Sequence, residues 1–281
     1  MEHGLSRLPV SFGDFLQQGD YRLHSRFSRA LNYANEEHLV SLVTPEVGSG
    51  PTNIVLSDIS WIDASEIEVA ADLVRIGGRA VALPPERRYH SGLDFAVAEV
   101  HRSVQHLAVF SKVLLESSPP LSLVFLLDET RKNIFSSPFD RQLAARVSEA
   151  WNHLVRLDVS KGVSRMLGTG YGLTPSGDDF VAGWISGLHL MAGLFHRPAA
   201  EEMGLIRLQL TGGSPISRNL FWCSLHGRYV ERVRDLLQAI GSGPHGEVER
   251  CARDVLGIGE TSGADFSTGL VACLSLHGVL G

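Results

Sequence analysis

Two adjacent carboxylates, Asp178 and Asp179, end a glycine-rich stretch within Gly168-Thr-Gly-Tyr-Gly-Leu-Thr-Pro-Ser-Gly-Asp-Asp-Phe-Val-Ala-Gly183. Three glycines in five residues indicate a loop that needs positive φ angles or a close approach by a ligand. The apolar run from Phe180 to Phe195 predicts a buried helix directly after the loop. A glycine loop at a helix N-terminus presents backbone N–H groups and the positive end of the dipole, which favours an anion. Carboxylates at this place either cap the helix or hold a proton or cation beside the anion.

The same pattern returns near the C-terminus. The segment Ser176-Gly-Asp-Asp-Phe-Val-Ala-Gly183 aligns without gaps with Ser262-Gly-Ala-Asp-Phe-Ser-Thr-Gly269, and five of the eight positions are identical. Both segments precede apolar runs of helical length. We therefore predict two related helix starts that face each other across one cleft, with a chance similarity as the alternative.

Each segment also fits a simpler interpretation, a capping box in which a serine and a later acid satisfy the first helical turn. That interpretation gives Asp179 and Asp265 a structural role. It does not explain Asp178, whose counterpart is Ala264, or the three glycines that precede it. We therefore take Asp178 as the catalytic candidate, an exposed carboxylate that takes a proton or holds Mg²⁺ against a phosphate.

The other candidates for ligand binding are small residues, hydroxyls and the two remaining acids. A second small-residue stretch, Thr211-Gly-Gly-Ser-Pro-Ile-Ser217, is either a further wall of the cleft or a turn between helices. Lys161, Arg165 and Arg218 could neutralise an anion, although solvated helix faces commonly carry such side chains. The candidate ligand-binding residues are Gly170, Gly172, Thr174, Ser176, Gly177, Asp179, Ser217, Ser262, Gly263 and Asp265.

The elements that must position these residues change character near residue 85. Before it, short β-rich runs and one period-two run alternate with turn signals, and Gly77-Gly78 predicts a tight hairpin. Residues 1–36 show no clear pattern. The predicted strands are residues 39–44, 53–56, 67–74 and 79–83, which together indicate a small antiparallel sheet or barrel.

The second half of the chain carries helical patterns with capping residues between them. Asp140, Asp158 and Ser217 are the predicted N-caps. The predicted helices are residues 93–116, 140–154, 158–167, 176–193, 218–225, 230–240, 246–256 and 263–277. The fold class is therefore α+β: a small antiparallel β-rich domain over residues 1–90, followed by an all-helical domain over residues 91–281. The helical domain carries the glycine loop and both Ser-Gly-x-Asp helix starts.

The composition narrows the class of protein. A chain of 281 residues with 44% hydrophobic and 20% charged residues is typical of a globular protein, and its net charge of −6 argues against nucleic acid as a partner. Cys223, Cys251 and Cys273 have no metal-binding spacing and are expected as buried free thiols. We find no secretory signal and no apolar run long enough for a membrane span, so we expect a cytoplasmic protein without a membrane partner.

Two stretches of the sequence resemble a known family. The string Leu-Thr-Pro-Ser-Gly-Asp-Asp at residues 173–179, with a later Gly-x-Thr-Ser-Gly-x-Asp at residues 259–265, is similar to the bacterial family that includes the AllH subunit of oxamate carbamoyltransferase. Leu39-Val-Ser-Leu-Val43 and Gly50-Pro-Thr-Asn-Ile-Val55 resemble the β region of that family.

The resemblance implies a cytoplasmic role in purine-derived nitrogen catabolism. There, a multi-subunit enzyme interconverts oxalurate plus phosphate with oxamate plus carbamoyl phosphate. The implied partners are a small anionic metabolite and the other subunits, and a homo-oligomer is also compatible. The resemblance does not say which subunit carries the catalytic groups, so whether this chain is itself catalytic stays open.

Two alternatives to a carbamoyltransferase subunit remain. Ribokinase-like sugar kinases place Gly-Ala-Gly-Asp at a helix N-terminus, and residues 175–183 have a similar outline, so a phosphotransferase is one alternative. The chain lacks the alternating βαβ pattern of that fold, which indicates convergence on one kind of helix terminus. The other alternative is a non-catalytic protein that binds a metabolite or supports assembly.

Overall fold

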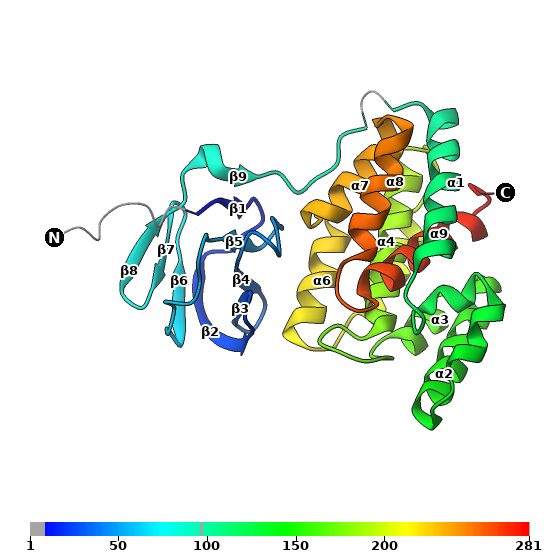
Figure 1. The fold of residues 1–281 in the computed structure, drawn as a ribbon, viewed down its shortest axis with the longest axis horizontal. Helices are drawn as coiled ribbons and strands as arrows, with labels where there is room; N and C mark the ends of the chain where they lie inside the picture. The colour runs from blue at the N-terminus through cyan, green and yellow to red at the C-terminus, as the bar shows by residue number, and fades with distance from the viewer. Residues whose placement is uncertain (1–8, 96–97, 281) are drawn as a thin grey trace. The chain divides into compact units, whose positions relative to one another are not determined.

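The computed structural model describes residues 9–95 and 98–280 of the chain (Figure 1). The chain divides into two compact units. The sheet unit comprises Met1–Gly92 together with Arg228–Arg234, and the helical unit comprises Leu93–Gly227 and Asp235–Gly281. The fold is α+β, as the sequence predicted, with a curled and mostly antiparallel sheet before a helical region.

The sheet has the strand order β8-β7-β6-β2-β3-β4-β5-β1-β9 in the described part of the chain. Neighbouring strands of the sheet are antiparallel, except for the two parallel pairs, β4 with β5 and β1 with β9. Tyr33, Val40, Leu42, Ile54 and Val74 are fully buried and belong to its core. The strands are β1 (Ser11–Gly13), β2 (Gly19–Arg26), β3 (Ala30–Ala34), β4 (Leu39–Val43), β5 (Asn53–Val55), β6 (Glu66–Val69), β7 (Leu73–Ile76), β8 (Arg79–Ala82) and β9 (Arg88–Tyr89).

The strand predictions need two corrections. Strands β1, β2 and β3 lie in the part of the sequence that showed no clear pattern, because β2 buries only Tyr21 fully and fills its other positions with polar or half-exposed residues. The strand predicted over residues 67–74 is a hairpin of β6 and β7, whose turn is closed by a bond from the Ala70 N–H to the Leu73 carbonyl. The hairpin predicted at Gly77-Gly78 is confirmed, since both glycines have positive φ angles, +55° and +79°.

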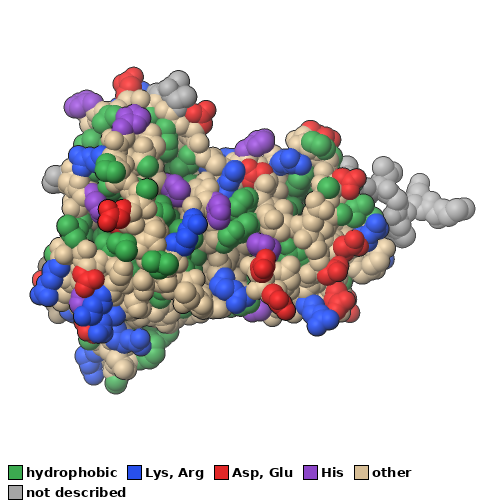
Figure 2. Space-filling view, turned by 180° about the vertical axis from the view of Figure 1, so that it is seen from behind, with side chains coloured by type: hydrophobic (Ala, Val, Ile, Leu, Met, Phe, Trp, Pro, Cys, Tyr) green, Lys and Arg blue, Asp and Glu red, His purple; other side chains and the backbone are tan. Residues whose placement is uncertain are grey.

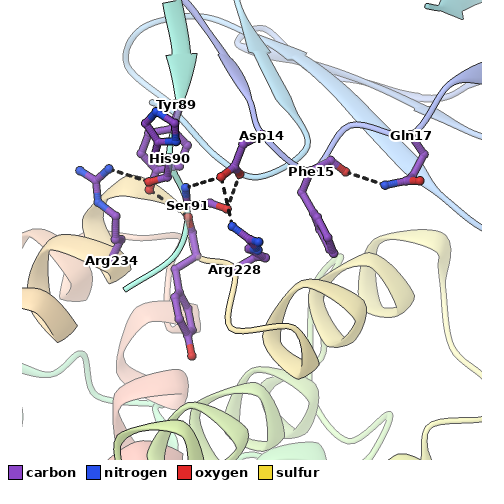
Figure 3. Close-up of polar contacts among 9 residues, drawn as sticks. Asp14, Phe15, Gln17, Tyr89, His90, Ser91, Arg228 and Arg234 are labelled. Carbon is purple, nitrogen blue, oxygen red and sulfur yellow. Dashed lines mark hydrogen bonds and ion pairs between the residues drawn. The ribbon is translucent and has the colours of Figure 1, made fainter. Parts of the chain in front are cut away.

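The segment Arg228–Arg234 belongs to the sheet unit and is held there by polar contacts (Figure 3). The Asp14 carboxylate accepts hydrogen bonds from the backbone N–H and the hydroxyl of Ser91. It also forms an ion pair with Arg228 at 3.1 Å. The Tyr89 hydroxyl donates to the Tyr229 carbonyl at 2.9 Å. Asp14 therefore joins three separate stretches of the chain into one unit.

The helical unit is built from helices that surround α4 and α9, two helices buried along most of their length (Figure 1). Among the described residues from 138 onward, none lies in a strand, as predicted. The helices are α1 (Val100–Ser117), α2 (Pro138–Val155), α3 (Val159–Met166), α4 (Ser176–Gly193), α5 (Ala200–Gln209), α6 (Pro215–Leu225), α7 (Glu231–Ser242), α8 (His245–Leu256) and α9 (Ser262–Leu276). The first residues of α7 belong to the sheet unit.

Several helix boundaries differ from the predictions. Helix α1 begins at Val100, where residue 93 was predicted. Helix α2 is capped by Ser137, and Asp140 is the acid of that capping box. Helix α6 is capped by Ser214, because Pro215 suits the first helical position. Helix α5 was not predicted, since it buries only Ile206 and so lacks a clear apolar stripe. The predicted cap of α3, Asp158, is confirmed.

Helices α4 and α9 approach each other so closely that their backbones touch. A Cβ atom on Gly183 would lie 1.8 Å from the Phe266 carbonyl oxygen, and one on Gly269 would lie 1.9 Å from that of Phe180. The alignment of the two segments pairs residue 183 with 269 and residue 180 with 266. The two contacts are therefore equivalent positions of the repeat, seen once from each helix. The related sequences therefore form a pair of neighbouring helices with reciprocal contacts.

The similarity between α4 and α9 extends to the helices that precede them, α3 and α8. A Cβ on Gly177 would lie 1.9 Å from the Met166 carbonyl oxygen at the end of α3, and one on Gly263 would lie 1.8 Å from that of Val255 in α8. The helical unit thus contains two similar helix pairs, α3 with α4 and α8 with α9. Among the described residues, no helix combines the length and hydropathy that a membrane crossing requires.

Candidate functional site

A cavity of about 470 Å³ lies within the helical unit between two loops. One is the glycine loop, residues 167–175, which connects α3 to α4. The other is the small-residue loop, residues 210–214, which connects α5 to α6. The cavity is lined by Ser164, Leu167, Gly168, Gly172, Leu173, Pro175, Asp178, Gln209, Leu210, Thr211, Gly212, Gly213, Ser214, Ser217 and Phe221. The small-residue loop is therefore both a turn between two helices and part of the cavity lining.

The glycine loop needs its glycines. Gly168, Gly170 and Gly172 have φ angles of +68°, +129° and +89°, which other residues rarely adopt. A Cβ on Gly170 would also lie 2.5 Å from the Ser176 nitrogen, so the loop passes directly over the start of α4. Tyr171 fastens the loop to α2, because its hydroxyl donates to Asp140 at 2.7 Å.

Asp178 joins the glycine loop to the cavity. Its Oδ1 atom accepts a hydrogen bond from the Gly168 N–H at 2.8 Å. Its Oδ2 atom has no hydrogen-bond partner among the residues that the structure describes. The side chain is only 3% exposed, so the expectation of an exposed carboxylate was wrong: the loop folds over it and leaves it in the cavity wall.

Three of the N–H groups in the first turn of α4 already have acceptors. The Gly177 N–H donates to the Thr169 carbonyl at 2.8 Å, and those of Asp178 and Asp179 donate to the Pro175 carbonyl. The first turn of α4 is therefore not the set of free donors that the sequence suggested. Among the cations considered as counter-charges, Arg165 forms an ion pair with Glu149 at 2.8 Å. No Lys or Arg is among the residues that line the cavity.

The capping-box interpretation of the two helix starts is wrong. The N-caps are Pro175 and Thr261, and neither makes a side-chain capping bond. Ser176 and Ser262 are instead the first residues of their helices, and each acts on the acid of the other helix. The Ser262 hydroxyl lowers the pKa of Asp179 and the Ser176 hydroxyl lowers that of Asp265, although burial outweighs both effects.

Asp179 and Asp265 are not among the residues that line the cavity. Together with Ser176 and Ser262 they form a cluster that we call the acid junction. Burial raises the pKa of Asp179 well above its usual value, and the charges of Asp265 and Asp178 raise it further. The Thr174 hydroxyl donates to Asp179 at 3.2 Å. Neighbouring carboxyls buried together favour the protonated form, so the surroundings of the junction disfavour two ionised acids.

Asp265 is the more deeply buried acid. Burial raises its pKa to about 7. Its Oδ1 atom accepts the Leu123 N–H at 2.6 Å, whereas Oδ2 has no direct hydrogen-bond partner in the part of the chain that is described. A buried oxygen without a donor is costly for an ionised carboxylate. The geometry therefore agrees with a carboxyl that keeps its proton.

The predicted site residues separate into two groups. Gly172, Asp178 and Ser217 line the cavity, and Gly170 and Thr174 lie in the loop beside it. The residues Ser176, Gly177, Asp179, Ser262, Gly263 and Asp265 lie at the helix starts and the acid junction. Sequence reasoning missed Ser164, Gln209 and Phe221, which carry no signal of their own. It also missed Ser214, although Ser-Pro before a helix is a recognisable cap signature.

The site offers few groups for a metal ion. The described residues contain no group of three or more His, Cys, Asp or Glu side chains placed to hold one. Tyr171 and Leu173 of the glycine loop expose about half of their surface. Figure 2 draws one face of the molecule, on which hydrophobic side chains reach the surface among charged ones.

Comparison with known proteins gives one match. The model of the family described as oxamate carbamoyltransferase subunit AllH matches residues 166–274, a range that contains both loops of the cavity and both helix starts. Neither the curated proteins nor the solved structures gave a match. The family match confirms the resemblance of the two motifs at residues 173–179 and 259–265, and it supports a relation of this part of the helical unit to the AllH subunits of oxamate carbamoyltransferase.

Proposed function

We propose that this chain is a subunit of an oxamate carbamoyltransferase-type complex and binds a phosphate- or carboxylate-containing metabolite in the cavity between its two loops. The proposal assigns it to the cytoplasm and to purine-derived nitrogen catabolism. The observation that carries it is Asp178. This carboxylate is almost fully buried, lines the cavity, and keeps one oxygen without a partner among the described residues, within the segment that matches the family.

The chemistry of carbamoyl transfer needs a group of this kind. When oxalurate is split by phosphate, the bond between the carbamoyl carbon and the amide nitrogen breaks, and a phosphate oxygen bonds to that carbon. The leaving nitrogen then takes up a proton and becomes the amide of oxamate. A carboxyl group within hydrogen-bond reach of the nitrogen can deliver this proton and recover it in the reverse reaction. We assign this role to Oδ2 of Asp178.

A role for Mg²⁺ at Asp178 is the second form of the proposal. The chain supplies one carboxylate at the cavity and no cluster of metal-ligating side chains in its described part. Mg²⁺ is often held by one or two carboxylates together with substrate phosphates and water. A magnesium ion at this site would thus depend on the bound phosphate, and binding of phosphate would then require Mg²⁺.

The test is carbamoyl transfer from carbamoyl phosphate to oxamate, measured with the purified chain and with the complete complex. We expect little or no turnover by the chain alone, because its cavity contributes a carboxylate but no cationic side chain to neutralise a transferred phosphate group. We expect turnover by the complex, reduced by on the order of 10²-fold or more in Asp178→Asn.

The matched control is Asp254→Asn, which makes the same change in an exposed carboxylate of α8 outside the cavity. Its complex should keep full activity. Robust turnover by the isolated chain would contradict the need for partners. An unaffected Asp178→Asn complex would contradict the catalytic role. Binding without turnover in the complex would favour a metabolite-binding subunit.

A further inference from the structure

The hydrogen-bond acceptors and donors of the cavity lie on different elements, and this arrangement can determine the orientation of a bound ligand. Asp178 stands on the glycine-loop side, and its free oxygen can only accept a hydrogen bond when ionised. The Gly168 N–H beside it is already used by its other oxygen. This side of the cavity therefore offers an acceptor and a negative charge.

The small-residue loop offers donors. The backbone N–H groups of Gly212, Gly213 and Ser214 have no acceptor among the described residues, and all three residues line the cavity. Gly213 has a φ angle of +98°, and a Cβ on Gly212 would meet no atom within 4 Å, so the backbone here is open to a ligand. Successive N–H groups before a helix form a concave donor site for anions.

We propose that the cavity binds a two-ended ligand, with a carboxamide or carbamoyl N–H group on Asp178 and an anionic group on the N–H groups of residues 212–214. This inference rests on the proposed function and names the class of ligand and its orientation. An amide N–H satisfies the free oxygen of Asp178. An anionic group in the same place would face a like charge in a buried wall, where repulsion is screened weakly.

The size of the cavity agrees with such a ligand. At about 470 Å³ it lies within the range of small-molecule sites, and apart from the amide-bearing Gln209 its remaining lining is small, apolar or hydroxyl-bearing. Ser164 and Ser217 lie in this lining and can donate or accept as a ligand requires. The direction of the ligand is thus set by two fixed groups, the Asp178 carboxylate at the start of α4 and the backbone N–H groups of the small-residue loop.

Oxamate and oxalate test the inference directly, because they differ only in whether an amide or a second carboxylate occupies one end. We would titrate each into the purified chain by calorimetry, with EDTA and then with Mg²⁺. We expect oxamate to bind on the order of tenfold or more tightly than oxalate without metal, since hydrogen bonds to a charged group are strong. In Asp178→Asn the preference should shrink severalfold, while Asp254→Asn should keep it.

The outcomes separate the inference from the proposed function. Equal or tighter binding of oxalate, above all if it requires Mg²⁺, would overturn the orientation and make Asp178 a metal ligand, while the chain would remain a metabolite-binding subunit. A preference for oxamate that Asp178→Asn retains in full would also overturn the inference. Binding of neither compound would count against both. The comparison in wild-type protein needs no variant, so it stands even if Asp178→Asn folds poorly.

Discussion

The two helix starts of the helical unit share a sequence but not a role. Both Ser176 and Ser262 begin a helix, both act on the acid of the other helix, and both are followed by a glycine packed on a backbone carbonyl. The start of α4 also carries Asp178 under a long glycine loop, whereas the start of α9 carries Ala264 after the shorter connection of residues 257–261.

The difference shows which residues build the fold and which build the site. The residues common to both starts make the acid junction and the contact of α4 with α9. The residues found in one copy alone, Asp178 and the extra glycines, line or cover the cavity. At the other start, Asp265 is used to hold the Leu123 backbone at 2.6 Å. The residues that the two copies of the motif share therefore indicate structure, and the residues in which the copies differ indicate function.

The largest effect should come from breaking the shared contact of the two helices. We expect Gly183→Ala and Gly269→Ala to destabilise the protein by about 3 kcal/mol or more each, because the added Cβ meets a carbonyl oxygen on the partner helix. Urea denaturation measures the loss. The two variants should lose similar amounts if the pair is symmetric.

Gly204→Ala in α5 is the matched control. A Cβ there meets no atom within 4 Å, so the change should stabilise by roughly 0.5–1 kcal/mol through helix propensity. Full stability of Gly183→Ala would show that the helices are not in backbone contact, and the comparison of the two starts would lose its basis.

A smaller effect is expected from the protonation of the acid junction. The pKa of Asp265 is about 7 in the folded protein and 3.8 when unperturbed. The folded state thus binds the proton more tightly, so this group's contribution to stability is complete below pH 3.8 and is lost as the pH rises through 7. Between these values the free energy of unfolding should fall by on the order of 1 kcal/mol per pH unit from this residue.

Asp265→Asn checks this prediction, because an amide does not titrate in this range. Denaturation of both proteins from pH 5 to pH 8 should give a flatter profile for the variant than for the wild type. Profiles of equal slope would mean that Asp265 is ionised in the folded state, where the Leu123 N–H and the hydroxyls of Ser176 and Thr261 would stabilise its charge.

The sequence predicted the parts of the fold that depend on local patterns. The sheet before residue 85, the helices after it, the Gly77-Gly78 hairpin and the start of α4 all follow from periodicity and turn chemistry. Strand β2 and helix α5 were missed because each buries one side chain fully and leaves little apolar pattern to read.

Local patterns in the sequence likewise predicted only part of the site. The glycine loop and Asp178 stood out because three glycines and a second acid exceed what a helix cap needs. The other half of the cavity comes from α5 and the small-residue loop, which meet the glycine loop only through tertiary packing. The capping box failed for a related reason: the Ser176 and Ser262 hydroxyls act on acids 89 and 83 positions away in the sequence, and no local pattern records such a pairing.

The smallest effect should come from Asp179→Asn, and it bears most directly on the division between junction and cavity. A lost capping bond would cost about 1 kcal/mol, but Asp179 makes no such bond to its own helix start. Its pKa is raised by burial first and then by Asp265 and Asp178, so its surroundings favour the neutral acid, which an amide resembles in shape. The Thr174 hydroxyl can still donate to the amide oxygen.

We therefore expect Asp179→Asn to change the free energy of unfolding by less than about 1 kcal/mol at pH 7, within the range of a substitution that preserves shape and hydrogen bonding. It should bind oxamate as the wild type does, because Asp179 does not line the cavity. Calorimetry of Asp178→Asn and Asp179→Asn side by side makes the comparison, since the two changes are chemically identical and adjacent in sequence. If both variants lose oxamate equally, the acid junction belongs to the site, and the separation of fold from function at these two helix starts is wrong.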